Sequence, residues 1–156
     1  MKVLMSLGIA ASLLVTSTVT LAADEKQIKE AIEYRQAALH TMGWNFGPLG
    51  AMAKGDMDYD AEEAGMRAER VAMLAQMPWE GFIEGSLRDD GHGVNTDALA
   101  KIADNQDDFE SLQTEMQDAT AKLAEVAQQD DFAVFRKQVA DTGKTCKNCH
   151  DEYRAE

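Results

Sequence analysis

The chain has 156 residues with 15 Lys and Arg against 28 Asp and Glu, which gives a formal net charge of −13. This balance argues against nucleic acid as a partner, because proteins that bind the phosphate backbone do so through clustered Lys and Arg. Two cysteines allow one disulfide at most, and a charged fraction of 28% is typical of a globular surface. The length therefore suits one folded domain without a disulfide scaffold.

The N-terminal segment Met1–Ala23 has the three parts of a secretory signal peptide. Lys2 supplies a positive charge, the run Val3–Val15 is apolar, and small residues precede a cleavage site after Ala22 or Ala23. A membrane anchor is the alternative, but it requires about 20 apolar residues, and this run is shorter and interrupted by Ser. We therefore expect export to the periplasm and a mature chain of net charge −14 without a membrane span.

Residues 24–156 are expected to form one all-α domain. They contain 20 Ala but only nine Val and Ile, and the two prolines are Pro48 and Pro78, so the composition favours helix over sheet. A first helix is predicted to begin near Asp24, with Gly47-Pro48 as its kink or end. Its stripe has a 4-3-4-3-4 spacing and consists of Ile28, Ile32, Arg35, Leu39, Met42 and Phe46.

Two further helices are predicted in the middle of the chain. One begins at Tyr59-Asp60, carries a methionine-rich stripe and stops at Pro78. The other runs from about Asp97 to Gln129, with apolar residues at strict 3-4 alternation. The segment 81–96 between them contains four glycines and is expected to be a loop.

A fourth helix is predicted to begin at Asp130 or Asp131, whose carboxylates suit a helix N-terminus. Both cysteines fall on its stripe, which consists of Phe132, Phe135, Val139, Thr142, Cys146, Cys149 and Tyr153. Four amphipathic helices with such stripes pack as an antiparallel up-down four-helix bundle, with crossing angles of about 20°.

The segment Cys146-Lys147-Asn148-Cys149-His150 is a C-x-x-C-H motif, which indicates covalent attachment of haem c. Attachment needs two thiols that reach two vinyl groups of one porphyrin and a histidine that reaches its iron. On a helix, Cys149 lies at i+3 and His150 at i+4 from Cys146, so the three side chains share one side. We expect two thioether bonds from Cys146 and Cys149, and His150 as the axial iron ligand.

Three other interpretations of the two cysteines compete with haem. A thioredoxin-like pair lies at the start of a helix after a strand, whereas this pair lies in the last turns of the last helix. A zinc site needs two more ligands, and the other histidines are His40 and His92. A disulfide between positions three apart on a helix has poor geometry. Export favours haem, because bacteria attach haem c outside the cytoplasm.

Several segments outside the motif carry a family resemblance that extends over essentially all of the mature chain. Together with the motif they are Tyr34–Leu39, Tyr59–Ala61, Pro78–Phe82, Cys146–His150 and His150–Arg154. In these segments the chain resembles the cytochrome c′ family. The resemblance implies a four-helix bundle with one covalently attached haem c near the C-terminus.

The resemblance also implies haem contacts at matching positions. Arg35 and Gln36 match first-helix residues that contact the haem, and the family's arginine pairs with a propionate. An arginine in an apolar stripe also needs an anion, which favours the propionate over the alternative of a surface cation.

Leu39 matches the residue that covers the distal face of the iron, and Phe82 matches an aromatic of the same pocket. Arg154 matches a basic residue beside the axial histidine. Leu39 and Phe82 also suit ordinary core positions, and Arg154 a solvent-exposed one.

Leucine has no lone pair, so Leu39 over the iron leaves it five-coordinate and high-spin. The resemblance implies binding of NO and CO, and discrimination against O₂ because an apolar pocket offers no hydrogen bond. The alternative is a low-spin, six-coordinate electron-transfer cytochrome with His40 or Met42 as the sixth ligand. His40 is rotated about 100° from Leu39, and Met42 lies about 4.5 Å further along the helix. We expect His92, in the loop, to be in solvent.

Gas binding and electron transfer through the Fe(III)/Fe(II) couple are compatible functions, and the acidic surface favours a basic redox partner. An enzyme such as a peroxidase lacks support, since no distal His–Arg pair is visible in the stripe. The family is commonly homodimeric through the first two helices. The methionine-rich stripe of the second helix is adaptable enough to serve that contact or the monomer's own core.

Overall fold

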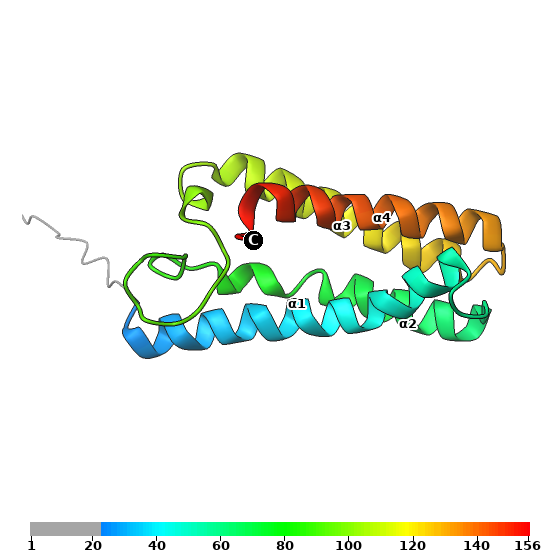
Figure 1. Ribbon diagram of the computed structural model, residues 1–156, viewed down its shortest axis with the longest axis horizontal. Coiled ribbons are helices and arrows are strands. Elements are labelled where there is room, and N and C mark those ends of the chain that lie inside the picture. The colour runs from blue at the N-terminus through cyan, green and yellow to red at the C-terminus, as the bar shows by residue number, and fades with distance from the viewer. Residues whose placement is uncertain (1–22) are drawn as a thin grey trace, which may run out of the picture.

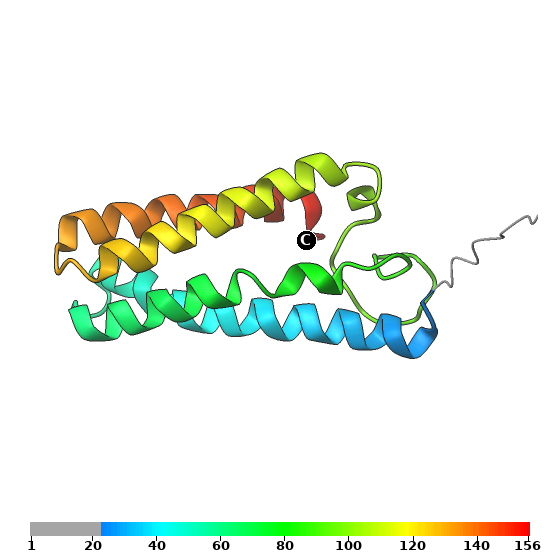
Figure 2. The same ribbon diagram turned by 180° about the vertical axis from the view of Figure 1, so that it is seen from behind.

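The computed structural model describes residues 23–156, so all but the last residue of the predicted signal peptide lies outside the described residues. Its four α-helices are α1 (Glu25–Lys54), α2 (Ala61–Leu74), α3 (Gln106–Ala127) and α4 (Phe132–Tyr153). Figures 1 and 2 show an antiparallel up-down bundle, in which the C-terminus and the loop before α3 lie at the same end. The predicted all-α four-helix bundle is confirmed. Within residues 23–156, no helix is long and apolar enough to span a membrane.

Aspartate side chains begin three of the four helices, as the sequence predicts. Oδ1 of Asp24 accepts a hydrogen bond from the amide of Gln27 at 2.7 Å, and Oδ1 of Asp60 accepts one from the amide of Glu63 at 2.9 Å. Asp131 accepts from two amides of the first turn of α4. These caps satisfy amides that have no partner within the helix, and each contributes about 1 kcal/mol.

The two prolines do not act in the same way. Pro48 lies inside α1, which continues to Lys54 and is closed by Gly55 in the left-handed conformation, with a φ of 82°. Pro48 therefore removes one hydrogen bond from α1 without ending the helix. α2 already ends at Leu74, and Pro78 begins a short 3₁₀-helix, η1 (Pro78–Gly81).

The third helix begins later than the sequence predicts. α3 starts at Gln106, and a separate 3₁₀-helix, η2 (Ala100–Ile102), precedes it. The segment 97–99 pairs with the C-terminal end of the chain instead. The amide of Leu99 donates to the carbonyl of Tyr153 at 2.9 Å, and the amide of Ala155 donates to the carbonyl of Asp97 at 2.8 Å. The contact with α4 thus overrides the local preference for helix.

Buried apolar side chains form two clusters along the bundle. The first cluster contains residues of all four helices and is centred on Leu49, Val71, Leu123 and Phe135. The second cluster lies at the end that holds the loop and the C-terminus, and it consists of Leu87, Ile102, Phe109 and Tyr153. The division of the core matters for the functional site, because the two cysteines contact different clusters.

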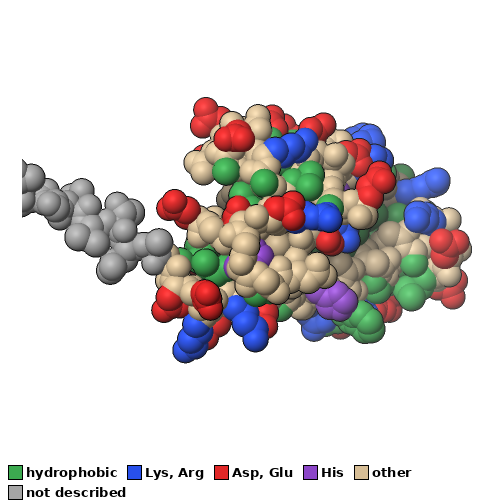
Figure 3. Space-filling model, turned by 60° about the vertical axis from the view of Figure 1, so that its left-hand side comes forward, with side chains coloured by type: hydrophobic (Ala, Val, Ile, Leu, Met, Phe, Trp, Pro, Cys, Tyr) green, Lys and Arg blue, Asp and Glu red, His purple; other side chains and the backbone are tan. Residues whose placement is uncertain are grey.

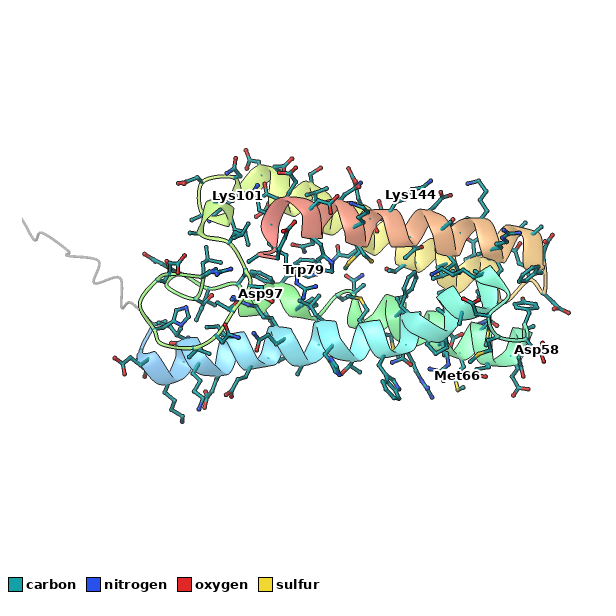
Figure 4. All side chains as sticks on the ribbon, in the orientation of Figure 1. Asp58, Met66, Trp79, Asp97, Lys101 and Lys144 are labelled. Carbon is teal, nitrogen blue, oxygen red and sulfur yellow. The ribbon has the colours of Figure 1, made fainter. Side chains whose placement is uncertain are left out.

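The methionines of the predicted second-helix stripe stay outside the core, whereas Val71 and Leu74 of the same stripe contribute to the first cluster. Met66, Met73 and Met77 are 44%, 61% and 44% exposed, whereas Ala64 and Ala68 are fully buried at the contact with the neighbouring helices. Figure 4 shows Met66 pointing away from the bundle. The predicted burial within the monomer therefore holds for Val71 and Leu74 but not for the methionines.

Candidate haem-binding site

Cys146, Cys149 and His150 lie in the last turns of α4. Both cysteines are free and half-buried, and His150 is exposed. Cys146 packs against the first cluster, and Cys149 packs against the second cluster. The motif therefore presents its two sulfur atoms where the two apolar clusters meet.

The surroundings of the motif set the protonation of its side chains. Burial raises the pKa of the Cys146 thiol, and burial with the charges of Cys146 and Asp108 raises the pKa of Cys149 to about 11. A thioredoxin-like pair depends on a thiol of lowered pKa, so this environment disfavours that interpretation. Partial burial and the charge of Arg154 lower the pKa of His150, which favours the neutral imidazole that coordinates metals.

Leu39 and Met42 approach the bundle interior from α1. Met42 is 8% exposed and belongs to the first cluster, and the half-buried Leu39 packs against the same cluster as Cys146. His40 is exposed, as its rotation about the helix predicts. Leu39 and Met42 are thus the two predicted distal candidates on the inner face of α1.

Phe82 belongs to an aromatic group that adjoins Cys149. Its ring centroid lies 6.0 Å from that of Trp79 and 5.0 Å from that of Phe109, and the Phe109 ring meets the Tyr153 ring edge-on at 5.3 Å. Phe82, Trp79 and Cys149 all pack against the second cluster. Figure 4 shows Trp79 between the two helix pairs. Cys149 therefore lies beside a cluster of aromatic rings.

Arg35 is 1% exposed, and its guanidinium donates four hydrogen bonds to the loop that follows α2. Nη1 donates to the carbonyl of Gly81 and to Oγ of Ser86, both at 2.8 Å. Nη2 donates to the carbonyl of Ser86 at 2.6 Å and to Oγ1 of Thr96 at 2.9 Å. Its charge also lies 4.4 Å from the centroid of the Phe82 ring, a cation–π contact.

The four bonds show how the buried guanidinium is satisfied within the protein. Burial lowers the pKa of Arg35 to about 10, so the side chain is still charged at neutral pH. Four neutral oxygen atoms accept its hydrogen bonds and the charge of Asp90 also acts on it, so its burial does not by itself require a propionate. Its pairing with a propionate remains a prediction, and its contact with the loop is a second role that the sequence did not indicate.

The loop is also fixed by hydrogen bonds of its own. Nε2 of Gln36 donates to the carbonyl of Asn95 at 3.0 Å. His92 is half-buried rather than in solvent, which corrects the prediction. Its Nε2 donates to the carbonyl of Leu87 at 2.7 Å, and its Nδ1 accepts from the amide of Val94 at 3.1 Å. His92 therefore organises the loop.

Arg154 follows α4 directly and lies on the exposed edge of the site. Its Nε is 3.7 Å from Oδ2 of Asp97, and its side chain is 57% exposed. Tyr153 faces inward and donates to Oδ2 of Asp108 at 2.6 Å, a bond that raises the pKa of Tyr153 to about 12. Arg154 thus lies near His150, as predicted, and it lowers the pKa of that imidazole.

Sequence reasoning missed the hydroxyl partners of Arg35 and the tyrosine–aspartate pair. Ser86 and Thr96 are 0% and 6% exposed, although small polar residues in a glycine-rich segment are ordinarily found at the surface. The sequence offered one weak sign: Ser86 follows closely after Pro78–Phe82, a segment that resembles the family. Nothing in the sequence indicated that Asp108 pairs with Tyr153, because an acidic residue in the first turn of a helix is already explained by its favourable interaction with the helix dipole.

Comparison with known proteins gives concordant matches over most of the chain. The family model described as Cytochrome C′ matches residues 30–154. The cytochrome c′ of Halomonas halodenitrificans is 50% identical over 129 residues, which cover 82% of this chain and 98% of the relative.

Two solved structures show the same likeness in three dimensions. Cytochrome c prime from Shewanella frigidimarina matches with a TM-score of 0.77 and 45% identity, covering 83% of this chain and 97% of the other. The nitric oxide complex of a mutant of cytochrome c prime from Alcaligenes xylosoxidans matches with a TM-score of 0.74 and 31% identity, covering 83% and 97%.

Proposed function

Because the chain belongs to the cytochrome c′ family, we propose that it is a periplasmic haem c protein that binds NO or CO at a five-coordinate, high-spin iron. The residues present fit covalent haem c. Two free thiols lie about one helical turn apart where two apolar clusters meet, and an imidazole follows them directly. Cys146 and Cys149 would hold the porphyrin through thioether bonds, and the His150 imidazole would bind its iron.

The position and chemistry of Leu39 are the main support for the proposed gas-binding site. Its side chain has no donor atom, and it packs against the same cluster as Cys146, so it is suited to cover the distal face without ligating. The bound haem supplies an open coordination position and an Fe(III)/Fe(II) couple. Leu39 restricts access by its size, and an apolar pocket without hydrogen-bond donors favours NO and CO over O₂. The nitric oxide complex of the Alcaligenes relative supports this assignment.

We propose no enzymatic activity for the site. Leu39 and Met42 offer no acid or base. Arg35, the buried cation of α1, is already hydrogen-bonded to the loop through both terminal nitrogens. A peroxidase-like reaction needs a group that transfers protons at the distal side, and these residues do not supply one.

Electron transfer is the second part of the proposal, and the charge distribution suggests where a basic redox partner would dock. α3 carries six acidic residues and one lysine, whereas α4 carries four Lys and Arg against three acids. Figure 3 shows acidic side chains scattered among uncharged and basic ones at the end that holds the loop. A basic partner is therefore drawn to the α3 side at low ionic strength.

We further propose a homodimer through α1 and α2. Trp44 is 72% exposed on α1, and Met73 is 61% exposed on α2. Exposed large apolar side chains on neighbouring helices are typical of a protein contact. The predicted signal peptide supports a periplasmic location.

Stopped-flow binding of NO to the reduced protein tests the gas-binding proposal. We expect Leu39→Ala to bind NO faster than the wild type, because the smaller side chain opens the distal side. Leu74→Ala is the matched control, since Leu74 is also a half-buried leucine packed against the first cluster, but from α2.

Two results would contradict the proposal. If Leu39→Ala binds NO at an unchanged rate, Leu39 does not restrict access to the distal side. A low-spin spectrum of the ferric protein shows a sixth ligand and favours the alternative, an electron-transfer cytochrome with a methionine ligand. Met42 is the residue to substitute in that case, because it is buried one turn from Leu39 in the first cluster.

A further inference from the structure

A groove of about 610 Å³ lies between the C-terminal half of α1 and the N-terminal half of α4. These segments lie side by side at the right-hand end of Figure 1. The groove exists because small residues face each other: Gly50 and Ala53 on α1, and Ala140 and Gly143 on α4. A Cβ at Gly50 would have no neighbour within 4 Å, so a side chain added there has room to extend into the groove.

The wall of the groove is apolar and its rim is cationic. Phe46 and Val139 contribute apolar surface, and Lys54, Arg136 and Lys137 are the charged residues that line it. No acidic residue lines it. This concentration of positive charge is unusual in a chain with almost twice as many acidic as basic residues.

Two of the three cations lack a carboxylate partner. Lys137 is 2.5 Å from Asp141. Among residues 23–156, neither Lys54 nor Arg136 has a carboxylate within 4.0 Å, although the chain is rich in acids. An anionic group that enters the groove can therefore pair with Lys54 and Arg136 without breaking an existing ion pair.

We propose that this groove binds a small amphiphilic anion, a medium-chain alkyl carboxylate, with the chain between α1 and α4 and the carboxylate at Lys54 and Arg136. The nine residues from Phe46 to Lys54 span about 12 Å along the helix, which accommodates a chain of medium length. The volume also lies within the range of about 300–1,000 Å³ for small-molecule sites. The groove contains none of the three C-x-x-C-H side chains, so this site is separate from that of the proposed function.

Isothermal titration calorimetry of the haem-loaded protein with decanoate tests the proposal. Decanol and decylammonium have the same chain with no charge or with the opposite charge. We expect decanoate to bind, decanol to bind more weakly and decylammonium not to bind. The double variant Lys54→Gln/Arg136→Gln should weaken decanoate binding about fivefold, as expected for two exposed ion pairs. Arg88→Gln, at an exposed arginine of the loop outside the groove, should leave it unchanged.

A second pair of variants tests the groove without altering charge. Gly50→Leu fills the groove and should abolish decanoate binding. Gly43→Leu is the matched control, because Gly43 is also helical, has no neighbour within 4 Å of an added Cβ and does not line the groove.

Three outcomes would overturn the proposal: no binding of decanoate, equal losses in Gly50→Leu and Gly43→Leu, or equal binding of decanoate and decylammonium. Sedimentation velocity of Gly50→Leu tests a second copy as the occupant. If that variant changes the oligomeric state while the wild type fails to bind decanoate, the groove is a protein contact and the proposal is wrong.

Discussion

Replacing Arg35 by methionine tests whether this residue holds the loop. The substitution keeps an unbranched apolar stem and removes the guanidinium, which leaves the buried oxygens of Gly81, Ser86 and Thr96 without their donor. A hydrogen bond to a charged group is worth about 1.5–3 kcal/mol. Four bonds to one group do not add, so we expect the free energy of unfolding to fall by about 3–5 kcal/mol, the cost of leaving several buried neutral acceptors unsatisfied.

Urea denaturation of the haem-loaded protein measures this loss, and hydrogen exchange shows where it acts. The amide of Arg88, which donates to the carbonyl of Ala98 at 2.7 Å, should exchange faster in Arg35→Met. The exchange rates of amides within α3 should change only as far as the global stability of the protein changes. Arg88→Met is the matched control, because Arg88 is an exposed arginine of the same loop, and we expect a change within about 0.5 kcal/mol.

The same measurements separate the loop contact from the predicted propionate contact. If Arg35→Met shifts the reduction potential but leaves loop exchange and stability as in Arg88→Met, the residue acts on the haem alone and the reasoning from the four bonds is refuted. Arg35→Lys keeps the charge but not the planar fork, so we expect an intermediate loss of stability.

Two further predictions concern Tyr153 and the proposed dimer. Because the folded pKa of Tyr153, about 12, exceeds the ordinary value near 10, its bond to Asp108 stabilises the fold fully below pH 10 and is lost as the pH rises through 12. In Tyr153→Phe, the tyrosinate absorbance change at 295 nm should therefore end at lower pH than in the wild type; an identical end point would contradict the assignment. Trp44→Glu should shift sedimentation towards the monomer, whereas Val134→Glu, at an exposed apolar residue of α4, should not. If sedimentation shifts in both variants or in neither, Trp44 is not part of a specific dimer contact.

The helices were predictable because local chemistry and core packing agree along most of the chain. The aspartate caps give three helix starts, and on α3 the side chains of Phe109, Met116, Leu123 and Val126 are buried as the 3-4 alternation requires. The start of α3 was missed for a non-local reason, since the segment 97–99 pairs with residues more than fifty positions later. Periodicity contains no information about such a pairing.

The same limit explains what could be predicted of the site. Cys146, Cys149 and His150 can be proposed from the sequence because the motif is contiguous and its spacing matches one helical turn. The partners of Arg35 were not found, because Ser86 and Thr96 lie 51 and 61 residues away in a segment without periodicity. The buried position of the arginine was visible in the stripe, but the sequence alone did not say which oxygen atoms would satisfy it.

The loop is tied to both sides of the site, and this gives its sequence a function. Arg35 fixes it to α1 at Ser86 and Thr96. The residues directly after the loop, Asp97 and Leu99, pair with Ala155 and Tyr153 at the C-terminal end of the chain. Leu87 of the loop belongs to the same cluster that contacts Cys149. Changes in the loop therefore reach Cys149 through packing rather than through coordination. A loop substitution that leaves the C-x-x-C-H motif intact should thus still alter the surroundings of the cofactor.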